Sequence, residues 1–515
     1  YVEDSQVELT LTGTMTIRDV SKPMTFKVLA RQKGNTLTAT AGALSVQFTA
    51  TGTADVPFKV SVVSGNNQTD TVQSTLSQPL VALVTDQFNN IAASAQVSFT
   101  VTAGGGGVSV LNGVSNSLGL VQTNFVLGPA AGVHTVRAAV AAVGSTTATF
   151  SATAQWPPLF ATEVAVGTTH ACAKRTTGQV VCWGSNASGE LGNASFAGSG
   201  VPVLVNGSGS IGYDRLTAGL NYTCAIRISN GQSNCWGNNS VGQLGNGGTS
   251  NASVPVAATG GTAFLALTTS ASTTCGLRTD GSGFCWGGGL NGQLGNGASV
   301  SSTAPVLVAG SLTFRSLVAG QVHVCGVTTT NVAYCWGGNT AGTLGSGLAG
   351  DSNIPVVVAG TQQWSSVALG SLHTCGIELS GAVYCWGSNP VGQLGVASAA
   401  SPILAPQLAT TTQLFTSLTA SGQGNCGVLA AGGLGACWGS NADGQLNRAA
   451  TPAAHLPGPV IGVGTVTFGR VALAPQFGCA IGSDGAVYCW GNNGSGQLGD
   501  GTTANSVAPV RVRSR

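Results

Sequence analysis

Residues 54–154 alternate hydrophobic and polar side chains over short stretches, and Gly, Asn and Pro interrupt these stretches. A period of two is typical of half-buried β-strands, and the interrupting residues are typical of turns. We therefore expect a set of short strands in this region, joined by tight turns.

A longer period governs residues 160–515. Cys-Trp-Gly occurs seven times, and the steps between the Trp residues are 53, 50, 50, 50, 52 and 52. A Gly follows each Trp after six residues and a Leu after eight. An Asn follows after three residues in six of the seven copies, with Gly289 as the exception. Seven copies of about 50 residues predict the blades of a propeller or the turns of a solenoid.

All 14 cysteines fall in these repeats, two in each, and the members of a pair are 10 or 11 residues apart. The second cysteine belongs to Cys-Trp-Gly. A turn such as Thr176-Thr177-Gly178 lies between the two, with Gly where a three-residue hairpin needs a left-handed residue. Such a hairpin sets the cysteines opposite each other, within disulfide range. The predicted disulfides are Cys172–Cys182, Cys224–Cys235, Cys275–Cys285, Cys325–Cys335, Cys375–Cys385, Cys426–Cys437 and Cys479–Cys489.

Metal binding is the alternative role for these cysteines. It would need short Cys-x-x-Cys spacings or His residues that converge on one site. Each pair is self-contained and far from the next in the sequence, which favours disulfides. Seven disulfides predict an oxidising compartment, which is the periplasm, the cell surface or the extracellular medium.

The full repeat contains Gly-x-x-His-x-Cys, then Gly-x-Val-x-Cys-Trp-Gly-x-Asn-x-x-Gly-Gln-Leu-Gly, then Pro-Val. The fifth copy shows it well, with Gly370, His373, Trp386 and Gly392–Gly395. Residues 160–515 thereby resemble the regulator of chromosome condensation repeat family, which implies a seven-bladed β-propeller of four-stranded blades. The family's nuclear members exchange guanine nucleotides on a small GTPase and sit on chromatin. The disulfides and weak basic charge of this chain depart from them, so we do not expect that activity. Secreted relatives include a propeller-type inhibitor of β-lactamase that acts by protein binding alone.

Residues 54–154 resemble a bacterial Ig-like domain of the invasin and intimin type. The stretches that carry the resemblance are Ser64–Thr69, Gln78–Val81, Val84–Asp86, Val97–Val101 and Leu127–Gly132. The length of about 100 residues fits one β-sandwich. Residues 155–159, which include Trp156-Pro157-Pro158, are predicted to form a short stiff linker to the propeller.

Residues 1–53 are predicted to contain a β-hairpin, as part of an incomplete domain. Leu11–Arg18 followed by Lys22–Phe26 resembles a hairpin of the YceI-like lipid-binding barrel family. A whole barrel needs far more chain, so we expect no lipid binding. Two interpretations remain open: two or three strands beside the Ig-like domain, or an exposed edge that pairs with a neighbouring molecule.

Composition excludes several partners. Charged residues make up 7% of the chain, and 18 Lys and Arg against 16 Asp and Glu give a net charge of +2. The cations are scattered except at Arg511, Arg513 and Arg515, so we expect no binding to nucleic acid or to an anionic membrane. No apolar stretch reaches the about 20 residues of a membrane-spanning helix. Because the chain begins with Tyr1 and not Met, we expect a processed or partial chain.

The sequence offers little catalytic chemistry. His170, His323 and His373 occupy equivalent repeat positions, so a ring of histidines around a propeller axis is geometrically conceivable, but a local packing role is the simpler interpretation. The carboxylates are dispersed, and those in recognisable turns or loops are Asp280, Asp351, Asp443 and Asp484. No Walker loop, nucleophile elbow or zinc-protease helix is present. We therefore predict no catalytic residue, no cofactor and no metal site.

These observations favour a non-enzymatic extracellular or cell-surface binding protein of bacterial origin, with an Ig-like spacer and a propeller that presents loops to a protein or glycan. The alternatives are a subunit of a filament or envelope assembly that self-associates through its N-terminal strands, and a secreted propeller enzyme acting on polysaccharide.

Irregular loops should carry the specificity of a propeller, since the repeated core only holds them. By that rule we nominate residues 194–202, 346–354 and 446–458. A closed propeller must also join its two ends, and we expect N- and C-terminal strands to share one blade. The C-terminal residues 505–515 are then essential for closure.

Overall fold

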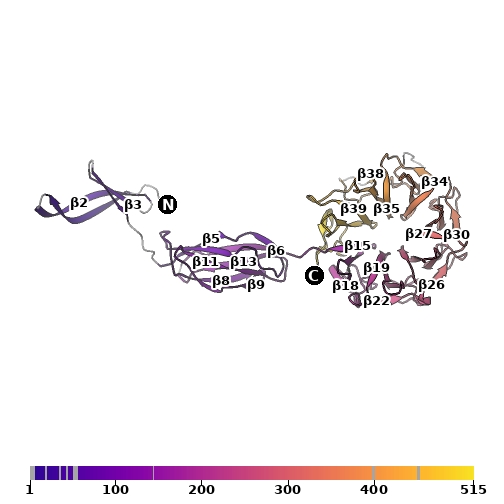
Figure 1. Cartoon of the computed structure of the whole chain (residues 1–515), viewed down its shortest axis with the longest axis horizontal. Helices are drawn as coiled ribbons and strands as arrows, with labels where there is room; N and C mark the ends of the chain where they lie inside the picture. The colour runs from indigo at the N-terminus through magenta and orange to yellow at the C-terminus, as the bar shows by residue number, and fades with distance from the viewer. Residues whose placement is uncertain are drawn as a thin grey trace. The chain divides into compact units, whose positions relative to one another are not determined.

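The computed structural model describes residues 6–17, 20–33, 36–41, 44–49, 56–142, 144–396, 401–448 and 453–514; for residues 6–49 and 453–455 only the backbone is described. The chain divides into two compact units, Tyr1–Trp156 and Pro157–Arg515. The described residues form strands and a single 3₁₀ turn, η1 (Thr259–Gly261), and none of their helical segments is long and apolar enough to cross a membrane. The all-β prediction is confirmed (Figure 1).

Four consecutive strands form an antiparallel sheet at the start of the chain. They are β1 (Gln6–Ile17), β2 (Val20–Lys33), β3 (Thr36–Ala41) and β4 (Leu44–Thr49). The predicted hairpin lies in β1 and β2, where Thr12 is opposite Thr25. The segment therefore holds four strands, where two or three were expected.

Residues 56–155 form two packed main sheets and a separate two-stranded sheet. The larger sheet has the order β10-β8-β13-β14-β6, a three-stranded sheet has the order β11-β7-β5, and β12 pairs with β9. Buried Leu80, Val84, Phe99, Val136 and Phe150 from both sheets belong to one hydrophobic core, which makes the domain a β-sandwich. The strands are β5 (Lys59–Ser64), β6 (Gln68–Thr71), β7 (Leu80–Thr85), β8 (Gln96–Ala103), β9 (Gly106–Val108), β10 (Asn112–Val114), β11 (Leu120–Thr123), β12 (Phe125–Leu127), β13 (Gly132–Ala139) and β14 (Ala148–Gln155).

The linker predicted over residues 155–159 is shorter in the structure. Strand β14 continues through Gln155, and Ser514 already donates a backbone hydrogen bond to Pro157 at 2.7 Å. Leu159 is buried in the hydrophobic core of the second unit. Most of the predicted linker therefore belongs to the propeller.

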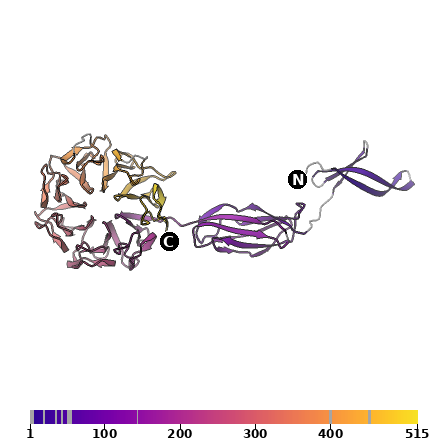
Figure 2. The same ribbon diagram turned by 180° about the vertical axis from the view of Figure 1, so that it is seen from behind.

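Seven four-stranded antiparallel sheets make up the second unit, and they stand side by side around a central opening (Figures 1 and 2). Each sheet is one blade and contains four consecutive strands, from the innermost to the outermost. Blade 1 contains β15 (Ala161–Val166), β16 (His170–Arg175), β17 (Val180–Gly184) and β18 (Ser199–Leu204). Blade 2 contains β19 (Tyr213–Ala218), β20 (Tyr222–Arg227), β21 (Ser233–Gly237) and β22 (Ala252–Ala257). Blade 3 contains β23 (Ala266–Thr269), β24 (Thr273–Leu277), β25 (Gly283–Gly287) and β26 (Ser302–Leu307).

The remaining blades repeat this order. Blade 4 contains β27 (Phe314–Ala319), β28 (His323–Thr328), β29 (Ala333–Gly337) and β30 (Ser352–Val357). Blade 5 contains β31 (Trp364–Leu369), β32 (His373–Glu378), β33 (Val383–Gly387) and β34 (Ile403–Leu408). Blade 6 contains β35 (Phe415–Ser421), β36 (Gly424–Leu429), β37 (Gly435–Ser440) and β38 (Ala453–Pro459). Blade 7 contains β39 (Phe468–Leu473), β40 (Phe477–Gly482), β41 (Val487–Gly491) and β42 (Ser506–Arg511).

One disulfide joins the two middle strands of every blade. Cys172 lies directly opposite Cys182, and the Cα atoms are 4.0 Å apart. The other six pairs have the same register and Cα separations of 4.0 to 4.1 Å. The hairpin turns carry left-handed residues where the sequence predicts them, for example Gly178 at a φ of 85° and Asn331 at a φ of 65°.

The repeated Trp residues join neighbouring blades. Each buried indole Nε1 donates to the backbone carbonyl just before the repeated Leu of the preceding blade, over 2.8 to 3.0 Å. The donor–acceptor pairs are Trp183–Gln497, Trp236–Glu190, Trp286–Gln243, Trp336–Gln293, Trp386–Thr343, Trp438–Gln393 and Trp490–Gln445. A Gly follows that Leu in six blades, and a Cβ at Gly345 would come within 2.5 Å of the Trp386 indole; blade 6 has Asn447 there instead, at a φ of 48°. The first of these bonds, from blade 1 to blade 7, closes the ring.

The expectation that N- and C-terminal strands share a blade is wrong. All four strands of blade 7 come from the C-terminal end of the chain. The two ends meet instead at a seam, where Leu159 donates to Val512 over 2.9 Å and Val487 donates to Leu159 over 2.8 Å. A short segment before the first blade thus completes the ring.

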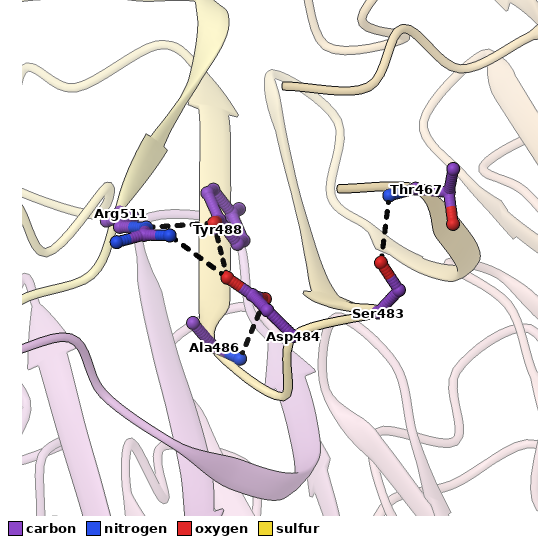
Figure 3. A network of polar contacts seen from close by, with 6 residues as sticks. All are labelled: Thr467, Ser483, Asp484, Ala486, Tyr488 and Arg511. Carbon is purple, nitrogen blue, oxygen red and sulfur yellow. Dashed lines mark hydrogen bonds and ion pairs between the residues drawn. The ribbon is translucent and has the colours of Figure 1, made fainter. Parts of the chain in front are cut away.

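A polar network fixes β42 at this seam (Figure 3). Arg511 donates from Nε to the Tyr488 hydroxyl over 2.8 Å and from a terminal nitrogen to the Asp484 carboxylate over 3.1 Å. The Tyr488 hydroxyl in turn donates to Asp484 over 2.8 Å, and the guanidinium stacks on the Tyr488 ring at 5.5 Å. Charge-assisted bonds of this kind are stronger than neutral ones, so the network anchors the last strand to the β40–β41 hairpin.

Candidate functional site

The three repeated histidines lie between blades. Each is the first residue of the second strand of its blade and is fully buried. His170 and His323 contact Thr223 and Thr374 of the next blade through Nε2 over 2.8 Å, and His373 contacts Asn425 over 2.9 Å. The geometrically conceivable histidine ring is therefore three separate contacts, each across a different blade interface.

The hydrogen bonds assign the protonated nitrogen of two of these rings. Thr374 donates its own proton to the Thr343 carbonyl, so its oxygen accepts from Nε2–H of His323. The Asn425 amide nitrogen donates to the Gln393 carbonyl, so its oxygen accepts from Nε2–H of His373. Nδ1 of each histidine has no partner among the described residues. The rings are thus neutral and buried.

Burial lowers the pKa of His170 to about 4, that of His323 to about 3 and that of His373 to about 4. The cause is desolvation of the imidazolium, which the Asn425 hydrogen bond to His373 only partly offsets. Within the described part of the chain, no group of three or more His, Cys, Asp or Glu residues is placed to hold a metal ion. The histidines have no access to a substrate, and their role is structural.

A glycine stands three residues before each histidine and leaves room for its imidazole ring. A Cβ at Gly370 would lie 2.1 Å from Cε1 of His373, and a Cβ at Gly167 would lie 2.3 Å from Cε1 of His170. Gly219 stands in the same relation to Tyr222 of blade 2, at 2.2 Å. In the other blades the position is not Gly. It is Ser270 before Thr273 and Ser421 before Gly424, where the first residue of the second strand is small, and Ala474 before Phe477.

The partner in the next blade follows the same logic. His and Tyr hydrogen-bond to a Thr or Asn of the next blade, and where the first residue is another one, the equivalent position of the next blade carries no polar side chain. The seven pairs are His170–Thr223, Tyr222–Thr274, Thr273–Val324, His323–Thr374, His373–Asn425, Gly424–Gly478 and Phe477–Ala171. This correlation between neighbouring repeats is present in the sequence, but the sequence analysis did not use it.

Three of the four carboxylates singled out from the sequence hold local structure. Asp280 accepts from the Ser282 amide over 2.9 Å, and Asp484 accepts from the Ala486 amide over 3.1 Å, as Asp does in turns. Asp351 accepts from the Asn339 amide over 2.7 Å. The fourth, Asp443, takes part through its backbone amide, which donates to the Gln445 side chain over 3.0 Å. The four lie in four different blades.

The loops nominated as irregular are more regular than predicted. The repeated Asn three residues after Trp clamps the loop in blades 1, 2, 4 and 7. Asn339 donates to the carbonyls of Leu348 and Gly350 over 2.9 and 3.0 Å. Asn186 donates in the same way to Ser195 and Ala197, over 2.9 Å in both cases. Loops 194–202 and 346–354 therefore share this clamp. Blade 3 lacks it because Gly289 replaces Asn, and residues 449–452 of loop 446–458 lie outside the described residues.

Large apolar side chains stand exposed on the loops, both in blades with the Asn clamp (Phe196 and Leu348) and in blade 3, which lacks it (Leu290 and Val300). Leu290 is 77% exposed, Leu348 is 72% exposed, Val300 is 60% exposed and Phe196 is 56% exposed. The loops of blades 3 and 4 are tied together, because the amide of Gly297 donates to the Asn353 carbonyl and the Asn353 side chain donates to the Gly297 carbonyl, both over 2.9 Å. Exposed apolar side chains on rigid neighbouring loops are typical of a protein interface.

A central cavity of about 380 Å³ lies at the propeller axis. The turn between the first and second strands of every blade contributes to its lining. These turns bring Gly167, Gly219, Gly320 and Gly370 to the wall, with the interblade rings of His and Tyr behind them. None of the residues that line the cavity carries an ionisable side chain.

Residues 280–327, 332–377 and 484–515 match the regulator of chromosome condensation (RCC1) repeat, and residues 161–190 and 364–393 match a second form of the same repeat. A structure of Kap60 bound to yeast RCC1 (Prp20) is 20% identical over 62% of this chain and 79% of that chain, with a TM-score of 0.56. Human WBSCR16 is 17% identical over 65% of this chain and 94% of that chain, with a TM-score of 0.58. Prp20p from Saccharomyces cerevisiae, described with its binding to Gsp1p and histones, is 20% identical over 62% of this chain and 82% of that chain, with a TM-score of 0.56. At these identities the likeness shows the fold alone, and the Ig-like and YceI-like resemblances of the first 154 residues stay predictions.

Proposed function

Because the second unit is a propeller of RCC1 repeats with a disulfide in every blade, we propose that this chain is a non-enzymatic binding protein of an extracellular or cell-surface compartment. In this proposal the propeller presents its loops to a protein or glycan partner, and the Ig-like sandwich is the spacer that carries it. The disulfides support the oxidising compartment.

The observation that carries the proposal is which side chains of the propeller are buried and which are exposed. The repeated Trp and His residues are buried and hydrogen-bonded between blades, and most of the repeated Asn residues are buried within their loops. The loops also expose large apolar side chains, namely Phe196, Leu290, Val300 and Leu348, beside polar residues such as Asp351. Catalysis usually recruits titratable groups, and these loops present few of them. Recognition by apolar anchors needs no titratable group.

Self-assembly by strand pairing is the second candidate function, and the outer strands bear on where it could occur. The outermost strand of every blade contains a proline, which has no N–H to donate to an added strand. These prolines are Pro202, Pro255, Pro305, Pro355, Pro406, Pro457 and Pro509. The edge strand β4 of the N-terminal sheet contains neither proline nor a charged residue. Assembly by strand pairing would therefore involve the N-terminal sheet and not the propeller rim.

The binding proposal predicts that the double variant Leu290→Ser and Leu348→Ser captures its partner at least about tenfold less than the native chain, because truncating an anchor costs on the order of 1–2 kcal/mol. Partner capture from an extract of the native cell envelope, with quantitation of the retained protein or glycan, measures this. The matched control is Leu379→Ser, which changes a 58% exposed Leu in the β32–β33 hairpin. Exchange of loop 346–354 for residues 246–254 of blade 2 should have the same effect as the double variant, since blade 2 keeps the Asn clamp.

Equal loss of capture in the Leu379→Ser control would contradict a site on the loops. So would full capture by the loop exchange. The same proteins are to be assayed against polysaccharide and peptide panels. Reproducible turnover that disappears on changing one Asp, Glu or His would overturn the binding proposal and support the polysaccharide-acting enzyme.

A further inference from the structure

We propose that the central cavity of the propeller is a second binding site, separate from the loops, and that it takes a neutral, hydroxyl-rich ligand of the saccharide class. The inference rests on the walls, the hydrogen-bonding groups and the size of the cavity. It does not depend on the partner of the loops.

The wall is made of small residues for a structural reason. Gly320 and Gly370 cannot carry a side chain, because a Cβ there would lie 2.9 Å and 2.1 Å from Cε1 of His323 and His373. The alanines Ala218, Ala319 and Ala420 precede the turns in their blades. The packing of the blade interfaces thus keeps the axis of the propeller open and exposes backbone along it.

Part of that backbone is left unpaired. In three blades the turn amide bonds to the next blade: Thr168 donates to Leu220 over 3.4 Å, Leu220 to Ser270 over 3.2 Å, and Ser371 to Gly422 over 2.8 Å. The equivalent amides of Ala271, Gln321 and Gly422, in blades 3, 4 and 6, have no acceptor among the described residues. Ala271 and Gln321 stand in adjacent blades and neither is buried, so their amides are open to a ligand or to water.

Uncharged side chains add both donors and acceptors. Thr168, Gln321, Ser371 and Ser421 line the cavity, and none of their side chains has a hydrogen-bond partner among the described residues. Hydroxyl and amide groups can each donate and accept, which matches the hydroxyls of a saccharide. Leu220 and Pro475 supply apolar surface beside them. The polar part of the lining exceeds the apolar part, which suits a hydroxyl-rich ligand better than an apolar one.

The cavity selects against charge. Its lining offers no ionisable side chain to pair with a carboxylate, phosphate or ammonium group, and an unpaired charge in such a site is costly. The imidazoles behind the wall are neutral and cannot help, since their Nε2–H groups are bonded to the next blade. The volume of about 380 Å³ lies within the range of small-molecule sites and is large enough for one or two sugar rings.

The test is isothermal titration of the full chain with neutral oligosaccharides that end in glucose, galactose or mannose, and with matched oligosaccharides that end in a uronic acid. At least one neutral probe should bind, and should bind about tenfold or more tightly than its acidic match. Two variants that fill the cavity from different blades, Ser371→Trp and Ala271→Trp, should each weaken that binding by about tenfold or more. Leu379→Trp places the same side chain on an exposed hairpin that does not line the cavity and is the matched control, and an unchanged melting temperature shows that a filling variant is folded.

Three results would overturn the proposal. The first is that no neutral probe binds up to roughly 10 mM, which is near the weakest affinity that titration detects. The second is that the acidic probes bind as tightly as the neutral ones or more tightly. The third is that both Trp variants bind the neutral probe like the native chain. The loop variant Leu290→Ser with Leu348→Ser should bind the neutral probe like the native chain. If that variant loses the neutral probe while both Trp variants keep it, the saccharide binds at the loops and the cavity proposal is wrong.

Discussion

Deletion of residues 505–515 should lower the melting temperature of the propeller by about 10 °C or more and broaden its unfolding. The deletion removes β42, the Arg511 network with Tyr488 and Asp484, and the seam bonds of Val512 and Ser514 to Leu159 and Pro157. At roughly 1 kcal/mol for each hydrogen bond, and with the burial of Val512 lost as well, the cost is on the order of 5–10 kcal/mol. A ring with an open seam also loses cooperation between its first and last blades.

Differential scanning calorimetry of the full chain and of the truncated chain measures this effect. Tyr488→Phe is a milder variant for comparison, because it removes only the two hydroxyl hydrogen bonds of the network (Figure 3). It should lower the free energy of unfolding by about 1–3 kcal/mol. Deletion of residues 1–49 is the control, since it leaves every seam bond in place. A truncated chain that melts like the native one would show that the seam does not hold the ring.

Gly370→Ser should destabilise the propeller by about 2–3 kcal/mol, and adding His373→Thr with Asn425→Val should recover most of that loss. The serine Cβ would stand 2.1 Å from Cε1 of a fully buried imidazole, and forcing extra atoms into a packed interior costs this much. The triple variant reproduces the combination Ser270, Thr273 and Val324, which the native chain already uses between blades 3 and 4. The three positions should therefore be strongly non-additive.

Chemical denaturation of the single, double and triple variants measures the coupling. Gly248→Ser is the matched control, because a Cβ there meets nothing closer than 3.9 Å.

The dependence of stability on pH is a second measurement. His373 has a folded pKa of about 4 against an ordinary value of 6.5, so native stability falls as pH drops through this window, where only the unfolded chain takes up the proton. Removing His373 should lessen that fall. Additive effects at the three positions, or an unchanged acid response, would contradict the assigned role.

The local features of the propeller could be predicted from the sequence because they depend on residues close together in the chain. Gly178 in its turn and the facing pair Cys172 and Cys182 belong to one hairpin of about ten residues. The Asn three residues after Trp recurs in the sequence, and the structure shows what it does: Asn339 clamps the loop and accepts from the Leu344 amide over 3.0 Å.

Features that join distant residues were harder to predict. His170 and its partner Thr223 are 53 residues apart, so a single repeat gives no sign that they meet. Comparison of each repeat with the next would have shown it, because Thr or Asn stands in the next blade only where His or Tyr needs a partner. The seam was mispredicted because Leu159 fills it with backbone bonds that no side-chain pattern encodes. The central cavity also escaped prediction, since its donors include the backbone amides of Ala271 and Gln321.

Each repeat is a self-contained blade, closed by its own disulfide and joined to its neighbours by buried bonds. Non-reducing peptide mapping by mass spectrometry determines which cysteines are paired. We expect seven disulfides with separations of 10 or 11 residues, from Cys172–Cys182 to Cys479–Cys489, and no other pairing. Free thiols at these positions, or disulfides that link one blade to another, would contradict it.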